Sequence, residues 1–182
     1  MNRQYYMVEE NALPQGRWIL GNFRSTDFED RRRLGRQEPC KGVFTVDPGD
    51  GGRALEFSLT AFGLPIATIN LAETISRIAG DDVHLVPVRI KGYGEFRFVQ
   101  CLRVLDCLDE SRAVFQVLGD DDPTPSMRGQ YSVSKLIVDP ARIPADAHMF
   151  HVARWCVRPV ISSALRQVLV ETGSVGVDFV EA

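Results

Sequence analysis

The sequence lacks a long apolar run, a leader-like N-terminus and a strong charge of either sign. Its apolar stretches are interrupted by Pro65, Pro87 and Arg89, so none approaches the roughly 20 residues that cross a bilayer. The N-terminal segment carries Glu9 and Glu10 and has no apolar core typical of a secretory signal. A net charge of −3 gives no general attraction to nucleic acid or to anionic membranes. We therefore expect a cytoplasmic protein whose partners include neither nucleic acid nor membrane.

Cysteine and histidine are scarce, with four cysteines and three histidines in the chain. No two cysteines have the spacing of a zinc knuckle or a thioredoxin-like site, which favours reduced thiols used as small hydrophobic side chains. Asp146, His148 and His151 come nearest to a metal-binding cluster. On a strand the two imidazoles would point to opposite faces, whereas on a helix they would share one. The sequence predicts no metal and no cofactor.

Catalytic motifs are also missing: the sequence has no phosphate-binding loop, no nucleophile elbow and no zinc-protease motif. Gly92-Tyr93-Gly94 matches half of a dinucleotide-binding fingerprint, but no third glycine follows, so a hairpin turn is the better prediction. A cysteine–histidine nucleophile built from distant segments stays open. The pairs to inspect are Cys156 with His151 and Cys101 with His84.

What is present fits one globular domain over residues 1–182, because apolar residues make up 45% and charged residues 25% of the chain. The hydrophobic periodicity predicts an α+β fold with a mainly antiparallel sheet and a few packed helices. One helix is expected over Leu71–Ala79, capped by Asn70 and ended by Gly80. Another is expected over about Ser162–Thr172, ended by Gly173.

The centre of the chain predicts an antiparallel meander. Its first strand is Val83–Lys91, its long second strand is Glu95–Leu108, and Arg112–Leu118 returns beside that strand. A further strand is expected over His148–Val157. The Pro, Gly and Asp residues of Asp47–Gly52 are typical of a turn.

Two polar segments are expected on the surface. Residues 22–41 form a charged excursion, in which Arg31, Arg32 and Arg33 are accompanied by nearby acids. Residues 119–130 form an acidic loop with consecutive aspartates.

The acidic residues suggest a binding site. Between residues 106 and 122, six acids stand against one base, Arg112, which leaves a local charge of −5. Such a patch suits the positive active-site cleft of a nuclease, although strand ends and a solvated loop explain the same composition. Tyr93 is added as an exposed aromatic anchor. The predicted protein-binding residues are Asp106, Asp109, Glu110, Asp120, Asp121, Asp122 and Tyr93.

The order of segments carries a resemblance to a known family. The segments are Tyr5-Tyr6-Met7-Val8, Trp18-Ile19-Leu20-Gly21, Leu55-Glu56-Phe57, Gly63-Leu64-Pro65, the helix at 71–79, Leu85-Val86-Pro87-Val88, the strand ending in Val104-Leu105-Asp106-Cys107-Leu108-Asp109, Leu136-Ile137-Val138-Asp139, Met149-Phe150, Pro159-Val160-Ile161-Ser162 and residues 173–179. In this order they resemble a family of bacterial polymorphic-toxin immunity proteins, formerly a domain of unknown function and typified by a myxobacterial member. The matching positions are mainly apolar residues, glycine and proline.

The resemblance implies a non-catalytic immunity protein that binds and neutralises one cognate toxin by direct contact in the cytoplasm. It implies a toxin encoded by an adjacent gene, and it supplies no catalytic residues. Two alternatives stay open from the residues themselves. One is an enzyme with a scattered cysteine–histidine or carboxylate site, and the other is a non-catalytic adaptor without a toxin. Neither the toxin's activity nor the oligomeric state follows from the sequence.

Overall fold

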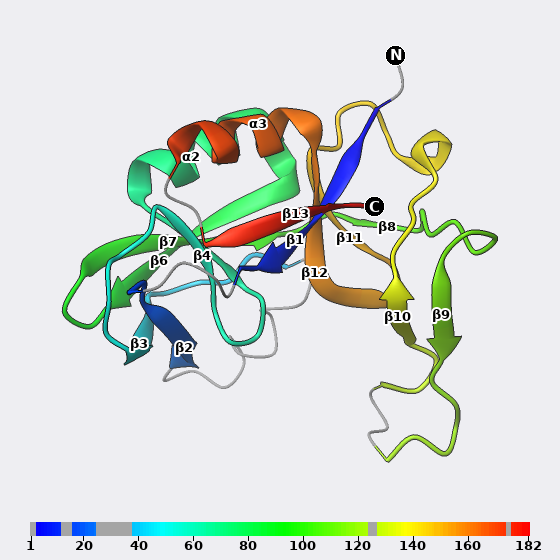
Figure 1. Ribbon diagram of the computed structural model, residues 1–182, viewed down its shortest axis with the longest axis horizontal. Coiled ribbons are helices and arrows are strands. Elements are labelled where there is room, and N and C mark those ends of the chain that lie inside the picture. Colours follow the sequence, from blue (N-terminus) through cyan, green and yellow to red (C-terminus); the bar gives the residue numbers. More distant parts are fainter. Residues whose placement is uncertain (1–2, 12–15, 25–37, 124–126, 174–175) are drawn as a thin grey trace.

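The computed structural model describes residues 3–11, 16–24, 38–123, 127–173 and 176–182 (Figure 1). This part of the chain contains two larger β-sheets, a separate two-stranded ribbon and two α-helices, which agrees with the predicted α+β class. Neither helix is long and apolar enough to span a bilayer. The predicted charged excursion falls mostly on residues 25–37, and residues 124–126 belong to the predicted acidic loop. Both of these stretches lie outside the described residues.

The five-stranded sheet brings the two ends of the chain together. In spatial order its strands are β13 (Val177–Glu181), β1 (Tyr5–Glu10), β12 (Trp155–Ser162), β11 (Met149–Val152) and β8 (Val104–Leu105). Its pairs are antiparallel except for β11 with β8, which is parallel. The strand predicted over His148–Val157 is therefore wrong, because the chain reverses between β11 and β12 and forms two paired strands.

The six-stranded sheet is built from the first half of the chain. In spatial order its strands are β2 (Ile19–Arg24), β3 (Phe44–Asp50), β6 (Val83–Ile90), β7 (Gly94–Cys101), β5 (Pro65–Ala67) and β4 (Phe57–Leu59). β3 and β6 pair in parallel, and the other pairs are antiparallel.

The turn predicted over Asp47–Gly52 begins too early, because β3 continues to Asp50. Pro48 lies opposite Leu20 on β2, with irregular register on both sides. The ladder to β6 ends at the pair Val46–Ile90, so Pro48 has no strand on its other side to which it would have to donate.

The two helices, α2 (Ile69–Ala79) and α3 (Ser163–Thr172), contact each other and cover one side of the sheets (Figure 1). Asn70 does not cap α2 as predicted. The N-cap lies two residues earlier, at Thr68, whose carbonyl accepts from the Ala72 N–H. Gly80 (φ 55°) and Gly173 (φ 65°) end the helices as expected, because glycine adopts positive φ without steric strain.

The long strand predicted over Glu95–Leu108 is also wrong. β7 ends at Cys101 in the six-stranded sheet, and Val104–Leu105 pairs with β11 in the five-stranded sheet. The chain thus passes from one sheet to the other at residues 102–103. The N–H of Leu102 donates to the carbonyl of Asp82 at 2.8 Å, which fixes this crossing beside the short 3₁₀ turn η1 (Gly80–Asp82).

Asp82 joins the two sheets through its side chain, which is 1% exposed. Its Oδ2 accepts from the backbone N–H groups of His148 (2.6 Å) and Met149 (3.1 Å) in the five-stranded sheet. Its Oδ1 lies 2.5 Å from Nε of Arg103, an ionic contact without the angle of a hydrogen bond among the described atoms. A buried carboxylate is tolerated only with such partners, so Asp82 is a structural residue.

Candidate protein-binding site

A β-hairpin projects from the body of the molecule (Figure 1). Its strands β9 (Val114–Val117) and β10 (Tyr131–Lys135) pair only with each other among the described strands. We call residues 114–123 and 127–135 the arm and residues 118–123 and 127–130 its tip. Arg112–Leu118 was predicted to return along Glu95–Leu108, which is wrong, since β9 pairs with β10 instead. A two-stranded hairpin is at best marginally stable in water, so the arm needs support from the body.

Tyr131 provides that support at the root of the arm. It is 7% exposed and belongs to an apolar cluster with Phe150 and Trp155 of the five-stranded sheet. Its ring packs against Phe115 across the hairpin, with centroids 4.8 Å apart. Its backbone N–H donates to the carbonyl of Arg154 at 2.7 Å. The arm therefore has one edge, along β10, that is engaged by the body.

Arg154 holds the arm from the turn between β11 and β12. Its guanidinium lies 4.2 Å from the centroid of the Tyr131 ring and donates to the Tyr131 hydroxyl (2.8 Å) and to the Gly129 carbonyl (2.7 Å). Among the described residues it is the only non-glycine with positive φ, at 63°. Such a conformation costs about 1–3 kcal/mol and persists only where the surroundings over-determine it. No local sequence signal marks an arginine for this role.

Three of the predicted acids lie near the root, where other side chains compensate them. Asp106 pairs with Arg142 at 2.8 Å, and Asp109 pairs with Arg112 at 2.6 Å. Glu110 accepts from the Tyr131 hydroxyl at 3.1 Å. The charge of −5 counted along the sequence is thus partly neutralised, because Arg142 approaches Asp106 from a distant segment.

Asp109 is the most strongly perturbed of these acids. The Ser111 hydroxyl donates to its Oδ1 at 2.6 Å, and Nε of Arg112 donates to its Oδ2 at 2.6 Å. The hydrogen bond from Ser111, followed by that from Arg112, lowers the pKa of Asp109 from 3.8 to about 2. These contacts order the turn that leads into β9. Asp109 therefore has a structural role in this turn.

Two aspartates of the tip, Asp120 and Asp121, are less compensated. Asp120 and Asp121 are exposed and form no ion pair with any described residue. Asp122 is half-buried, and its backbone carbonyl accepts from Nε and Nη2 of Arg128 at 3.3 Å each. Three acids against Arg128 leave the tip with a charge of −2. The exposed acidic character predicted for residues 106–122 is therefore concentrated at the tip.

Exposed apolar side chains accompany these charges. Val114 and Val117 on β9 are 56% and 54% exposed, and Met127 in the tip is 39% exposed. The arm therefore offers a partner both apolar contact and negative charge. Sequence analysis missed these apolar side chains, because Arg112–Leu118 was predicted to return beside Glu95–Leu108 in a larger sheet.

Tyr93, the predicted exposed anchor, is a half-buried structural residue. Its hydroxyl donates to the Gly52 carbonyl (2.7 Å) and accepts from the Gly52 N–H (2.9 Å). Its ring packs edge-on against Trp18 with centroids 5.0 Å apart. It lies in the turn between β6 and β7, on the opposite side of the molecule from the arm (Figure 1). The structure does not bring Tyr93 together with the acids.

The two cysteine–histidine pairs show no nucleophile geometry in the described part of the chain. Nε2 of His84 contacts the Cys40 carbonyl at 3.1 Å, and Nδ1 of His151 contacts the Arg158 carbonyl at 3.2 Å. Burial raises the pKa of the Cys101 and Cys156 thiols, whereas an activated thiol requires a lowered pKa. Burial also lowers the pKa of His151. Cys101 is buried and the two histidines are half-buried, so these three side chains fit packing roles, whereas Cys156 is exposed.

A serine–histidine contact was missed by sequence analysis. Nδ1 of His148 lies 2.9 Å from Oγ of Ser162, beside a cavity of about 180 Å³. Ser162 is the N-cap of α3, and its Oγ also accepts from the Leu165 N–H at 3.4 Å. The Ser162 hydroxyl thus lies 2.9 Å from His148 and 3.4 Å from the Leu165 N–H. Its role as the cap of α3 explains why it is held in this position.

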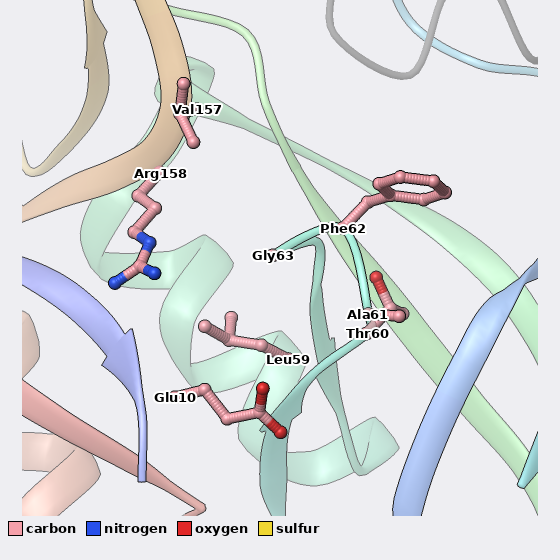
Figure 2. Close-up of a pocket in the computed structure, with 8 residues that line it drawn as sticks. All are labelled: Glu10, Leu59, Thr60, Ala61, Phe62, Gly63, Val157 and Arg158. Atoms are coloured by element: carbon pink, nitrogen blue, oxygen red, sulfur yellow. The ribbon is translucent and has the colours of Figure 1, made fainter. Parts of the chain in front are cut away.

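Another cavity, of about 240 Å³, lies beside the turn that follows β4 (Figure 2). Glu10 and Arg158 line it, and both charges have partners: Glu10 pairs with Arg17 at 3.0 Å and Arg158 pairs with Glu9 at 2.7 Å. The ring of Phe62 points away from the cavity and is 71% exposed. The cavity thus offers no uncompensated charge to a ligand.

No group of three or more His, Cys, Asp or Glu side chains within the described ranges is arranged to hold a metal ion. No protein-family model matches the chain, and no curated protein matches it.

Proposed function

We propose that this chain is a cytoplasmic immunity protein, a single and mainly antiparallel α+β domain that neutralises a cognate toxin by direct contact. The observation that carries the proposal is the arm, which presents exposed valines and an acidic tip outside the body of the fold. A non-catalytic inhibitor needs a stable scaffold and a surface of this kind, and it needs no activated side chain. The resemblance described above supports the same role.

The charge of the tip indicates the chemistry of the partner. Asp120 and Asp121 form no ion pair with the described residues, so they are available to a basic surface. Complementary charge speeds association and makes it sensitive to salt, while the apolar contacts slow dissociation. A toxin that acts on nucleic acid carries such a basic surface at its active site. The negative charge of the tip is complementary to that surface.

Co-expression tests the role. The chain is produced together with the protein encoded by the adjacent gene, and growth and co-purification are scored. We expect the neighbour to arrest growth when it is produced alone, and this chain to restore growth and to co-purify with it. A toxic neighbour that is neither bound nor relieved would contradict the proposal.

Charge reversal tests the site. The double variant Asp120→Lys/Asp121→Lys should bind the toxin about 10–100-fold more weakly, because it places like charges together, and it should lose salt dependence. The matched control is Glu73→Lys/Glu171→Lys, which reverses two exposed charges on α2 and α3. Equal affinities for the two double variants would exclude the tip from the interface.

The same experiments separate the two alternatives. An adaptor domain would bind a neighbour that is not toxic. An enzyme would relieve toxicity without a stable complex, and that relief would depend on a cysteine–histidine or carboxylate site and not on the arm.

A further inference from the structure

The outer edge of β9 is an unprotected strand edge. Natural proteins usually protect edge strands with charge, proline, shortening or a bend, because open N–H and C=O groups pair with other chains. The strand Val-Phe-Gln-Val has no charge, proline or glycine, and three of its four residues are exposed.

The other described edge strands are protected. β13 contains Asp178 and Glu181, β2 contains Gly21 and Arg24, and β4 is short and fully buried. β8 has only two residues, both half-buried. The contrast singles out β9 as the edge on which an additional strand fits.

The hydrogen bonds of the arm show which groups of β9 face outward. The N–H of Leu118 donates across the hairpin to the Gln130 carbonyl at 2.9 Å. In an antiparallel ladder the residues alternate, so Gln116 also points to β10, while Phe115 and Val117 turn their N–H and C=O groups to the open side.

The charges around β9 indicate which kind of strand can be added to this edge. At its start, Asp109 and Glu110 stand against Arg112 and Lys135, which is the cross-strand neighbour of Val114, so this end has no net charge, whereas the tip at the other end leaves −2. A second copy pairing in parallel through β9 would bring two acidic tips together. A strand that carries basic residues beside its uncharged core would meet opposite charge at the tip.

We propose that the outer edge of β9 binds an extended, uncharged segment of the toxin that is flanked by lysine or arginine. This inference rests on the proposed function and adds the mode of binding, which is strand addition to the arm. Main-chain hydrogen bonds to Phe115 and Val117 supply affinity, and the flanking charges supply direction and specificity.

A synthetic peptide tests the mode without the toxin. The probe is Lys-Lys-Val-Thr-Val-Thr-Val-Lys-Lys at millimolar concentration, with the same core flanked by glutamate as its control. Amide hydrogen exchange is followed by NMR on the full chain. We expect the basic peptide to protect the Phe115 and Val117 amides and to leave Gln116 unchanged. No protection, equal protection by the acidic peptide, or self-association of the chain through β9 would overturn the inference.

A matched pair of variants tests the mode in the toxin complex. Val117→Pro removes an outward N–H and leaves the hairpin ladder intact, whereas Val117→Thr keeps that N–H and a β-branched side chain. We expect Val117→Pro to bind about tenfold more weakly than Val117→Thr, as the loss of one main-chain hydrogen bond predicts. Equal affinities would overturn strand addition while leaving immunity intact. Failure of the wild-type chain to bind any toxin would instead overturn the proposed function.

Discussion

Replacement of Asp82 provides the most stringent test of the fold. This carboxylate accepts from two backbone N–H groups, those of His148 and Met149, and lies against Arg103, so it connects the two sheets. Asp82→Ala leaves these N–H groups without an acceptor. Removing one partner of a buried pair costs about 3–5 kcal/mol. Since the free energy of unfolding of a whole domain is about 5–15 kcal/mol, this loss brings the protein close to unfolding.

Arg103 limits the loss of stability expected for the conservative variant Asp82→Asn. Its Nη2 also contacts Asp146 at 3.1 Å, so its charge keeps a partner when Asp82 is neutralised. Asp82→Asn retains an oxygen for the backbone N–H groups, and we expect it to cost about 1–3 kcal/mol. Asp81→Ala, at the exposed neighbouring position, should change stability by less than about 0.5 kcal/mol.

Urea unfolding followed by circular dichroism measures these differences. We expect the midpoint to fall in the order wild type, Asp82→Asn, Asp82→Ala, with an unchanged slope. If Asp82→Ala unfolds within about 1 kcal/mol of the wild type, the carboxylate does not connect the sheets and the reasoning is refuted.

Three further predictions concern the arm and the helix cap. The lowered pKa of Asp109, about 2 against 3.8, means that its contacts stabilise the fold fully above about pH 4 and lose effect as the pH falls toward 2. Acid titration of unfolding should show this loss in the wild type and not in Asp109→Asn; identical profiles would contradict it. Arg154→Ala should speed amide exchange in the arm while leaving α2 unchanged, and uniform exchange rates would remove Arg154 as the anchor. Ser162→Ala should cost about 1 kcal/mol in urea unfolding, with Ser162→Thr restoring most of it; an unchanged midpoint would argue against the cap.

Features decided by neighbouring residues were predictable from the sequence. α3 has a serine at its start, glycine at its end and apolar residues at helical spacing, and all three signals act within a few residues. The end of α2 at Gly80 follows in the same way. Its start did not, because Asn70 and Thr68 are both acceptable near a helix N-terminus and tertiary packing chooses between them.

Features decided by distant residues were not predictable. The break between β7 and β8 depends on the contact of Arg103 with Asp82, and no local sequence pattern indicates this contact. The charge of the predicted acidic patch changes because Arg142 approaches Asp106 from another segment. Tyr93 looked like an exposed anchor because the sequence does not show that Gly52 and Trp18 enclose it.

The arm itself illustrates both cases. Val114–Val117 was correctly expected to be extended, since β-branched and aromatic residues favour strands. Its partner strand was not predicted, because pairing with β10 depends on the anchor that Arg154 and Tyr131 provide. The acids of the candidate site were thus proposed from the sequence alone, whereas its apolar edge was recognised only in the structure.

A footprint of the complex tests the central claim most directly. Hydrogen–deuterium exchange is measured over the whole chain, free and bound to the protein encoded by the adjacent gene. Our account predicts that protection is strongest in residues 114–123 and 127–135, with the body of the fold little changed. Protection centred on other strands, with the arm exchanging as in the free chain, would contradict the account.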